Sequence, residues 1–252
     1  MDPVILLHGF AQTPASWDEI AHHLQAQGHR TYVPDLYKRV ESTTDELCQY
    51  VADTVHQVAE VEGPPVLVGY SMGGRIAAET LVRHPDMPLA ALVLESAGLG
   101  PADEDARAAL AERNAAWAAR LREEGVEAFM DWWETLPLFA TQRDLPVATR
   151  AALRADRTAH TAEALAQSLE VWGAHTQTSE PETLAALARA HDQGLPILYL
   201  AGERDEKYTA VAERARQASL PTALIAGAGH NTHLEKPAAF LQIVTHKLSL
   251  LC

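Results

Sequence analysis

The sequence is poor in cysteine and has no long apolar runs. Its 252 residues include only two cysteines, Cys48 and Cys252, too few for a disulfide framework, and no CxxC pair is present to bind a metal. No apolar stretch reaches the roughly 18 residues of a membrane-spanning helix. The residues Met1–Pro3 precede only a short apolar run, so no signal peptide is predicted. We therefore expect a cytoplasmic protein.

Basic residues are also scarce. Lys and Arg together number 20, against 34 Asp and Glu, giving a net charge of −14. Such a balance argues against a nucleic acid or an anionic membrane as partner, although a few arginines can still line a pocket for a small anion. The 12 histidines form no HExxH motif, so we predict no metal and no cofactor. We expect a monomer or a small homo-oligomer.

What the sequence does contain is an alternation of short apolar runs with amphipathic stretches. Six runs are predicted to be strands: Val4–Leu7, Thr31–Val33, Val66–Gly69, Leu89–Leu94, Ile197–Leu200 and Ala223–Ala226. Helical patterns between them include Ser16–Gln27, Ser42–Val61 and Arg75–Arg83. Because the runs are continuously apolar, both faces of each strand are expected to be covered. This favours an α/β protein with a parallel sheet.

One long interval breaks this alternation. Residues 98–194 contain no convincing strand, only helical sequence rich in Ala, Glu and Arg. We predict a helical lid of residues 98–194, inserted between the fourth and fifth strands of a core formed by residues 1–97 and 195–252. The lid is expected to depend on the core rather than to form a second domain.

A candidate nucleophile follows the third predicted strand. The string Gly69-Tyr70-Ser71-Met72-Gly73-Gly74 lies between this strand and a predicted helix, the context of a nucleophile elbow. A strained turn presents the serine there, and glycines let strand and helix approach closely. The alternative is that Ser71 only caps the helix.

A serine nucleophile needs a base and an orienting carboxylate, which in such folds follow it in the order acid, then histidine. Asp205 and His230 come in this order, each after a predicted strand. Parallel sheets place their sites at these strand ends. Glu203 could replace Asp205, and His233 is a less favoured alternative to His230.

Two backbone amides are predicted to form an oxyanion hole, those of Met72 and Phe10. His8, in the same loop as Phe10, is interpreted as structural. Arg75 follows Ser71 by one helical turn, so it either binds a substrate carboxylate or forms a surface salt bridge.

These motifs, in this order, resemble those of the α/β-hydrolase superfamily over nearly the whole chain. Longer strings are similar to one of its families, the 2-succinyl-6-hydroxy-2,4-cyclohexadiene-1-carboxylate synthases of menaquinone biosynthesis. These strings are Gly69–Arg75, Leu94-Glu95-Ser96-Ala97, Phe129-Met130-Asp131-Trp132-Trp133, Pro137-Leu138-Phe139-Ala140, Gly202–Tyr208 and Gly227–Glu235.

The resemblance implies an α/β-hydrolase fold with helices on both faces of the sheet and the helical lid. Because the first predicted strand already leads into His8 and Gly9, without the antiparallel hairpin that opens many relatives, we expect a mostly or fully parallel sheet of about six strands. It implies a lyase that expels pyruvate from an enolpyruvyl-bearing cyclohexene. Its substrate is a small anion with several carboxylates, and the residues implied to bind it are Tyr70, Arg75, Trp132, Phe139 and Arg157. A family arginine aligns near Leu110, where Arg107 or Arg113 is expected to substitute for it.

Two other functions remain open at this stage. A carboxylesterase or a carbon–carbon bond hydrolase would use the same three residues with Ser71 as a covalent nucleophile. A binding protein of this fold would have no activity, although the complete triad argues against it.

Overall fold

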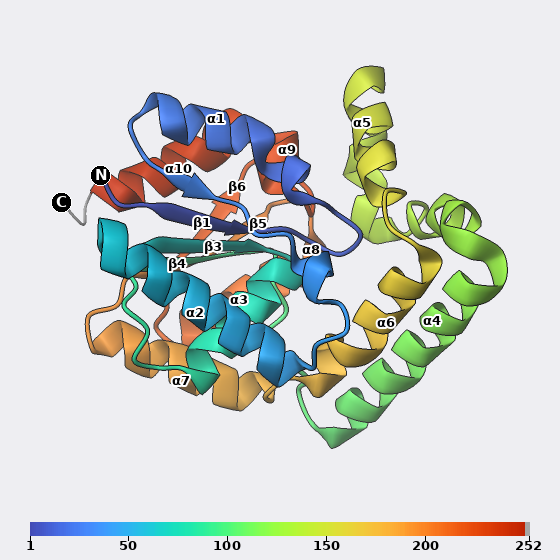
Figure 1. Cartoon of the computed structure of the whole chain (residues 1–252), viewed down its shortest axis with the longest axis horizontal. Helices are drawn as coiled ribbons and strands as arrows, with labels where there is room; N and C mark the ends of the chain where they lie inside the picture. Colours follow the sequence, from blue (N-terminus) through green and yellow to red (C-terminus); the bar gives the residue numbers. More distant parts are fainter. Residues whose placement is uncertain (250–252) are drawn as a thin grey trace.

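The computed structural model describes residues 1–249, which form one parallel β-sheet flanked by helices (Figure 1). The six strands lie in the order β2-β1-β3-β4-β5-β6, and each neighbouring pair is parallel. From β1 the chain first adds β2 on one side and then β3, β4, β5 and β6 on the other, so the direction of winding reverses at β1, as in doubly wound sheets. The predicted α/β fold with six parallel strands is confirmed.

The strand bounds differ only slightly from those expected. They are β1 (Val4–Leu7), β2 (Thr31–Tyr32), β3 (Val66–Tyr70), β4 (Ala91–Glu95), β5 (Ile197–Gly202) and β6 (Thr222–Ile225). The edge strand β2 is short and pairs with β1 at only two register positions. The four inner strands β1, β3, β4 and β5 are buried throughout, which explains their continuously apolar sequences.

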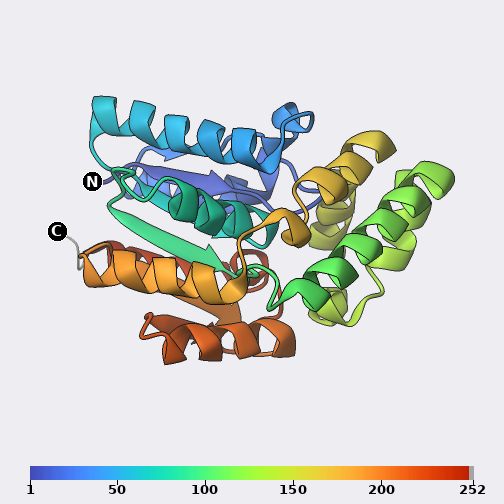
Figure 2. The same ribbon diagram turned by 90° about the horizontal axis from the view of Figure 1, so that it is seen from below.

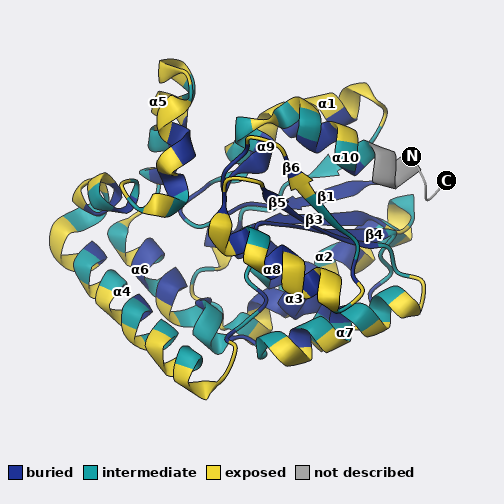
Figure 3. Cartoon of the chain, turned by 180° about the vertical axis from the view of Figure 1, so that it is seen from behind, coloured by how far each residue is buried: buried dark blue, intermediate teal, exposed yellow. Residues whose placement is uncertain are grey.

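Alternate residues of the four inner strands enter two different cores. On one face, Val68 and the residues beside it on neighbouring strands, such as Leu6 and Val93, pack under α1 (Asp18–Ala26) and α10 (Pro237–Ser249). On the other, Leu67 and its counterparts pack under α2 (Thr44–Glu62), α3 (Met72–Arg83), α7 (Glu180–Asp192) and α8 (Glu206–Gln217). Figure 3 shows the strands buried between helices whose outer faces are exposed.

Between β4 and β5 the chain forms a helical region beyond the carboxyl ends of the strands, opposite the amino terminus (Figures 1 and 2). It consists of α4 (Glu104–Trp133), α5 (Val147–Arg157) and α6 (Ala162–Val171), with the short 3₁₀ segments η3 (Pro137–Asp144) and η4 (Ala174–Thr176). Helix α4 bends at Gly125, whose φ is 81°. It packs along α6.

The last helix of the predicted lid lies elsewhere. Helix α7 packs against α3, and its Leu187 is buried in the same core as the sheet residues. We therefore propose that the lid extends from α4 to η4 and that α7 belongs with the core, although residues 98–194 were expected to form one lid.

The remaining short elements are η1 (Pro14–Trp17), η2 (Leu36–Arg39) and α9 (Thr232–Glu235). Among the described helices, none combines the length and the apolar character needed to cross a membrane. Cys48 is a buried free thiol, whereas Cys252 lies outside the described residues.

Candidate active site

Ser71 occupies a sharp turn between β3 and α3. Its backbone has φ 50° and ψ −108°, a strained conformation for a residue with a side chain. The turn is tight because strand and helix nearly touch: a Cβ at Gly69 would lie 2.6 Å from the Cα of Gly74. The Ser71 side chain does not cap α3, so its hydroxyl is directed to another partner.

That partner is His230. The Ser71 Oγ lies 3.0 Å from His230 Nε2, and His230 Nδ1 lies 2.7 Å from Asp205 Oδ2. Both His230 and Asp205 are buried. With Nδ1–H donating to Asp205, His230 Nε2 is left to accept the proton of the Ser71 hydroxyl. The structure thus brings together the three residues predicted to act as nucleophile, base and acid.

Asp205 is held in place by the helix that follows it. Its other carboxylate oxygen, Oδ1, accepts a hydrogen bond from the Tyr208 amide at 3.2 Å and so caps the amino terminus of α8. The Tyr208 ring packs against His230, with ring centroids 4.7 Å apart. Asp205 therefore both caps α8 and orients the His230 imidazole.

The two alternative members of the triad have other partners. Glu203 is exposed, and its carboxylate accepts the Gly227 amide at 3.0 Å. His233 is buried and pairs through Nδ1 with Glu95 Oε2 at 2.7 Å. Neither side chain takes the place of Asp205 or His230 beside Ser71.

The loop after β1 brings Phe10 to the same site. Its Gly9 amide donates to Gln12 Oε1 at 2.9 Å. The buried His8 ring links two backbone segments, with Nδ1 3.0 Å from the Gly9 carbonyl and Nε2 accepting from the Leu36 amide at 3.1 Å. Burial lowers the pKa of His8 to about 4. These contacts hold the Phe10 loop in a fixed conformation.

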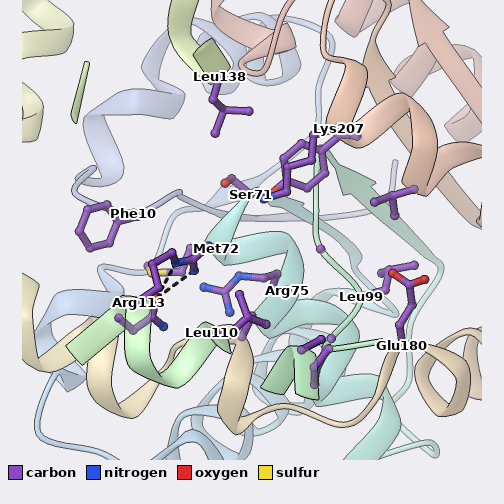
Figure 4. A pocket seen from close by; sticks show the side chains of 18 of the residues that line it. Phe10, Ser71, Met72, Arg75, Leu99, Leu110, Arg113, Leu138, Glu180 and Lys207 are labelled. Atoms are coloured by element: carbon purple, nitrogen blue, oxygen red, sulfur yellow. Dashed lines mark hydrogen bonds between the residues drawn. The ribbon is translucent and has the colours of Figure 1, made fainter. Parts of the chain in front are cut away.

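A cavity of about 600 Å³ opens beside Ser71, between the core and the lid (Figure 4). Its walls come from the loops that follow β1 and β4 and from helices on both sides, namely α3, α4, α6, α7, α8, η3 and η4. Among its lining residues are Phe10, Ser71, Met72, Arg75, Leu99, Leu110, Arg113, Trp117, Trp133, Lys207 and Tyr208. The lining is largely apolar, with a few cations around the serine, as is typical of small-molecule sites.

Arg75 projects from α3 into this cavity. Its Nη1 donates to the Trp172 carbonyl at 3.0 Å and to Gln177 Oε1 at 3.2 Å. Burial is the main cause that lowers the pKa of Arg75 to about 10, and the positive charge of Arg113 adds to it. No carboxylate of the described residues lies within 4 Å of this guanidinium, so the expected alternative of a surface salt bridge is not formed.

Arg113 lies on the lid side of the cavity, one turn along α4 from Leu110. Its Nη2 donates to Asn114 Oδ1 at 2.9 Å, and its guanidinium lies 4.6 Å from the centre of the Trp117 ring. Burial lowers its pKa as well. Of the two arginines expected near Leu110, Arg113 lines the cavity and Arg107 does not.

Three further predicted residues line a small cavity of about 40 Å³ next to Ser71: Tyr70, Phe139 and Arg157. Arg157 is buried, with only 4% of its surface exposed. Its charge is already compensated, because Nη1 lies 3.0 Å from Glu134 Oε1 and Nη2 donates to Gln142 at 2.8 Å.

Two predicted residues lie outside both cavities. Arg107 donates to the backbone carbonyls of His175 and Gln177, at 2.6 and 2.7 Å. Trp132 lies under the Arg120 guanidinium, 4.3 Å from it. Arg107 holds the segment that carries Gln177, whereas Trp132 packs within the lid.

Sequence reasoning did not assign Trp133, Lys207 and Gln177 to the site. Trp133 lines both cavities in place of its neighbour Trp132, and only the rotation of α4 decides which of the two faces the serine. Lys207 follows Asp205 by two residues, and this proximity was the available signal. Gln177 lies far from Arg75 in the sequence, and only folding brings the two side chains into contact.

The chain is similar in sequence to known proteins over most of its length. Residues 4–243 match the model of the alpha/beta hydrolase family. The 2-succinyl-6-hydroxy-2,4-cyclohexadiene-1-carboxylate synthase of Enterobacter sp. (strain 638) is 34% identical over 255 residues, covering 98% of this chain and 92% of that protein. The enzyme of the same name from Salmonella agona (strain SL483) is 37% identical over 254 residues, covering 98% and 94%.

Solved structures share the fold. MenH from S. aureus superimposes with a TM-score of 0.90 at 24% identity, covering 99% of this chain and 94% of that one. A thermophilic esterase from Thermogutta terrifontis gives a TM-score of 0.78 at 24% identity, covering 100% and 90%. The chain therefore belongs to the α/β-hydrolase family and, within it, to the family of the 2-succinyl-6-hydroxy-2,4-cyclohexadiene-1-carboxylate synthases.

Proposed function

We propose that this chain is a carbon–oxygen lyase of menaquinone biosynthesis. It eliminates pyruvate from an enolpyruvyl succinyl-cyclohexene carboxylate and forms 2-succinyl-6-hydroxy-2,4-cyclohexadiene-1-carboxylate. The observation that carries the proposal is the opening of the Ser71–His230–Asp205 relay into a cavity lined by cations without carboxylate partners among the described residues. Membership of the synthase family supports the same activity.

In the proposed reaction Ser71 acts as a base rather than as a covalent nucleophile. His230 accepts the hydroxyl proton through Nε2, and Asp205 stabilises the resulting imidazolium. The Ser71 oxygen then removes a ring proton next to the succinyl carbonyl, and the electron pair of that C–H bond moves onto the carbonyl oxygen. The backbone amides of Phe10 and Met72 are proposed to stabilise this oxyanion.

Collapse of the oxyanion completes the elimination. The electrons return through the ring, form the second ring double bond and break the bond between the ring carbon and the enolpyruvyl oxygen. The departing enolpyruvate takes up the proton held by His230 and leaves as pyruvate. No water is consumed, so the step needs no covalent intermediate on Ser71.

The charges of the cavity match those of the substrate. The substrate carries three carboxylates, on the succinyl chain, on the ring and on the enolpyruvyl group. Three cations line the cavity without a described acidic partner, namely Arg75, Arg113 and Lys207, whereas Arg214 is paired with Glu180. In Figure 4, Arg75 and Arg113 lie on one side of Ser71 and Lys207 on the other. Charge-assisted bonds from two sides would hold the ring over the serine.

The decisive experiment incubates the folded protein with the enolpyruvyl substrate and follows pyruvate with a coupled dehydrogenase. We expect pyruvate and the cyclohexadiene to form in equal amounts, and the Ser71→Ala variant is the control. Failure of the unmodified, folded protein to release pyruvate would reject the lyase.

Short p-nitrophenyl esters distinguish the lyase from a serine hydrolase of the same fold. An esterase would turn them over rapidly through an acyl-Ser71 intermediate, because such neutral esters need no cations in the cavity. We expect slow turnover that dicarboxylates inhibit, since these anions would occupy the sites beside Arg75 and Arg113.

Under the same proposal the substrate is a small anion with several carboxylates. We also propose that the enzyme acts in the cytoplasm. It requires no cofactor, because the proton moves between groups of the chain itself. The net charge of −14 disfavours polyanionic surfaces as partners, but it does not prevent the cations of one cavity from binding a small anion.

A further inference from the structure

A second buried pair of an acid and a histidine lies beside the catalytic one. Glu95 is the last residue of β4 and His233 is the second residue of α9, and both are buried. The Glu95 Oε2 lies 2.7 Å from His233 Nδ1, while Oε1 accepts from the Thr232 hydroxyl at 2.6 Å and from the His233 amide at 3.0 Å. The reaction proposed above uses none of these groups.

The carboxylate of Glu95 therefore holds the turn that follows His230. Thr232 and His233 come two and three residues after the base, and Glu95 caps the first turn of their helix. Glu235 holds the other side of the base, because its carboxylate accepts the Gly229 amide at 2.7 Å and the Asn231 amide at 3.3 Å. The backbone on both sides of His230 is thus tied to carboxylates.

The backbone of Glu95 holds the nucleophile as well. Its carbonyl oxygen accepts the amide of Ser71 at 2.8 Å, across the pairing of β3 with β4. One residue thus contacts both turns of the relay, the nucleophile turn through its main chain and the turn after the base through its side chain.

Aromatic packing supports the same connection. The His233 ring stacks on Trp17 with centroids 3.9 Å apart and meets the edge of Tyr70 at 5.0 Å. Tyr70 directly precedes Ser71 and also contacts His230, at 5.3 Å. Burying a carboxylate is unfavourable, so the burial of this pair is weak evidence that it adds stability.

We propose that Glu95 is a positioning residue that sets the 3.0 Å distance between Ser71 Oγ and His230 Nε2 by joining the two turns that carry them. It acts through His230 and Ser71 and does not touch the substrate. Its loss should therefore slow the chemical step without weakening the contacts of Arg75 and Arg113 to the substrate.

The test is the Glu95→Gln variant, with Glu62→Gln as the matched control. Glu62 is also largely buried, with 10% of its side chain exposed, and accepts from Arg30 and Tyr32 far from the site. We expect Glu95→Gln to lower kcat about 10–100-fold with KM changed less than about twofold, because small misplacements of reacting groups are costly. Glu62→Gln should retain both constants.

A second readout does not depend on the substrate. A fluorophosphonate probe forms a bond from phosphorus to the Ser71 oxygen while fluoride leaves and the hydroxyl proton passes to His230, so its rate reports the relay directly. We expect Glu95→Gln to slow labelling by a similar factor. The kcat comparison rests on the proposed lyase activity, whereas the labelling comparison holds even if the unmodified protein releases no pyruvate.

Should Glu95→Gln fail to fold, Thr232→Val removes one of the three donors to the carboxylate and should slow labelling about threefold to tenfold. A folded Glu95→Gln protein with unchanged labelling and unchanged kcat overturns the proposal. So does a Thr232→Val protein that labels at the unmodified rate in the absence of a folded Glu95→Gln protein.

Discussion

Arg75 and Gln177 bind each other twice. The guanidinium Nη1 of Arg75 donates to Gln177 Oε1 at 3.2 Å, and Gln177 Nε2 donates back to the Arg75 carbonyl at 3.0 Å. The amide therefore holds the guanidinium toward the cavity without neutralising it, leaving its charge for a substrate carboxylate.

Replacing Gln177 with leucine tests this arrangement. The variant should raise KM and lower kcat/KM by about 1–2 kcal/mol, because Arg75 loses the hydrogen bond that orients it. Steady-state kinetics with the enolpyruvyl substrate measure the change. The control is Gln217→Leu, whose amide donates to Glu213 on the exposed face of α8. Equal constants in the two variants would contradict the orienting role.

The Ser71→Ala variant should lose nearly all pyruvate release while keeping the fold. The Ser71 side chain makes its hydrogen bond to His230 and does not cap α3, so removing it leaves the helix intact. Circular dichroism and thermal unfolding verify the fold, and the coupled assay measures activity. Substantial residual activity would show that another group removes the proton.

Removing the charge of Arg75 should weaken substrate binding. We expect Arg75→Met to raise KM and to lower kcat/KM by about 2–4 kcal/mol, the contribution of a desolvated charge-assisted contact. Arg122→Met is the control, since Arg122 pairs with Glu163 and Glu170 on the lid surface. If Arg75→Met behaved like the unmodified enzyme, the carboxylate assignment would be wrong.

Lys207 should contribute less than Arg75. Its side chain is exposed at the mouth of the cavity, so water and salt screen its charge, and Lys207→Met should lower kcat/KM by only about 0.5–1 kcal/mol. The loss should shrink further as salt is added. An effect as large as that of Arg75→Met, or one independent of ionic strength, would place Lys207 in a desolvated contact instead.

Acid should destabilise the fold through His8. Burial lowers the pKa of His8 from 6.5 to about 4, so below pH 6.5 the unfolded chain takes up a proton that the folded chain does not. The stability due to the neutral ring is complete above pH 6.5, declines as the pH falls, and changes no further below about pH 4. By pH 4.5 the loss should be about 2.5 kcal/mol.

Urea unfolding of the unmodified protein and of His8→Gln, at pH values from 8 to 4.5, measures this effect. The variant is expected to be less stable at pH 8, because its side chain fits the Gly9 and Leu36 contacts less well, but to lose less stability on acidification. Parallel curves for the two proteins would show that His8 does not cause the acid sensitivity.

The order of elements was readable from the sequence because it depends on local patterns. Continuous apolar runs such as Val66–Gly69 predicted strands covered on both faces, and the glycines around Ser71 predicted the sharp turn. The chain order of Ser71, Asp205 and His230, each after a strand, indicated that the parallel sheet would bring them together. The distances in the structure agree with this expectation.

Other features could not be read because they depend on rotation and long-range packing. A helical pattern does not show which of Trp132 and Trp133 faces the serine, since the phase of α4 is set by its contacts with α6 and by the bend at Gly125. Nor does it show that α7 packs on α3 rather than over the site.

By itself, the sequence determined the α/β class and the order of strands and helices along the chain, and it proposed Ser71, Asp205 and His230 as the candidate triad, because apolar periodicity and turn chemistry act over a few neighbouring residues. Only the tertiary structure decided which charges are free. Arg107 is paired with Glu104 and Arg157 with Glu134, whereas Arg75 and Arg113 line the cavity without a carboxylate partner among the described residues. An arginine's availability depends on the carboxylates and carbonyls that folding brings near it, often from segments far apart in the chain.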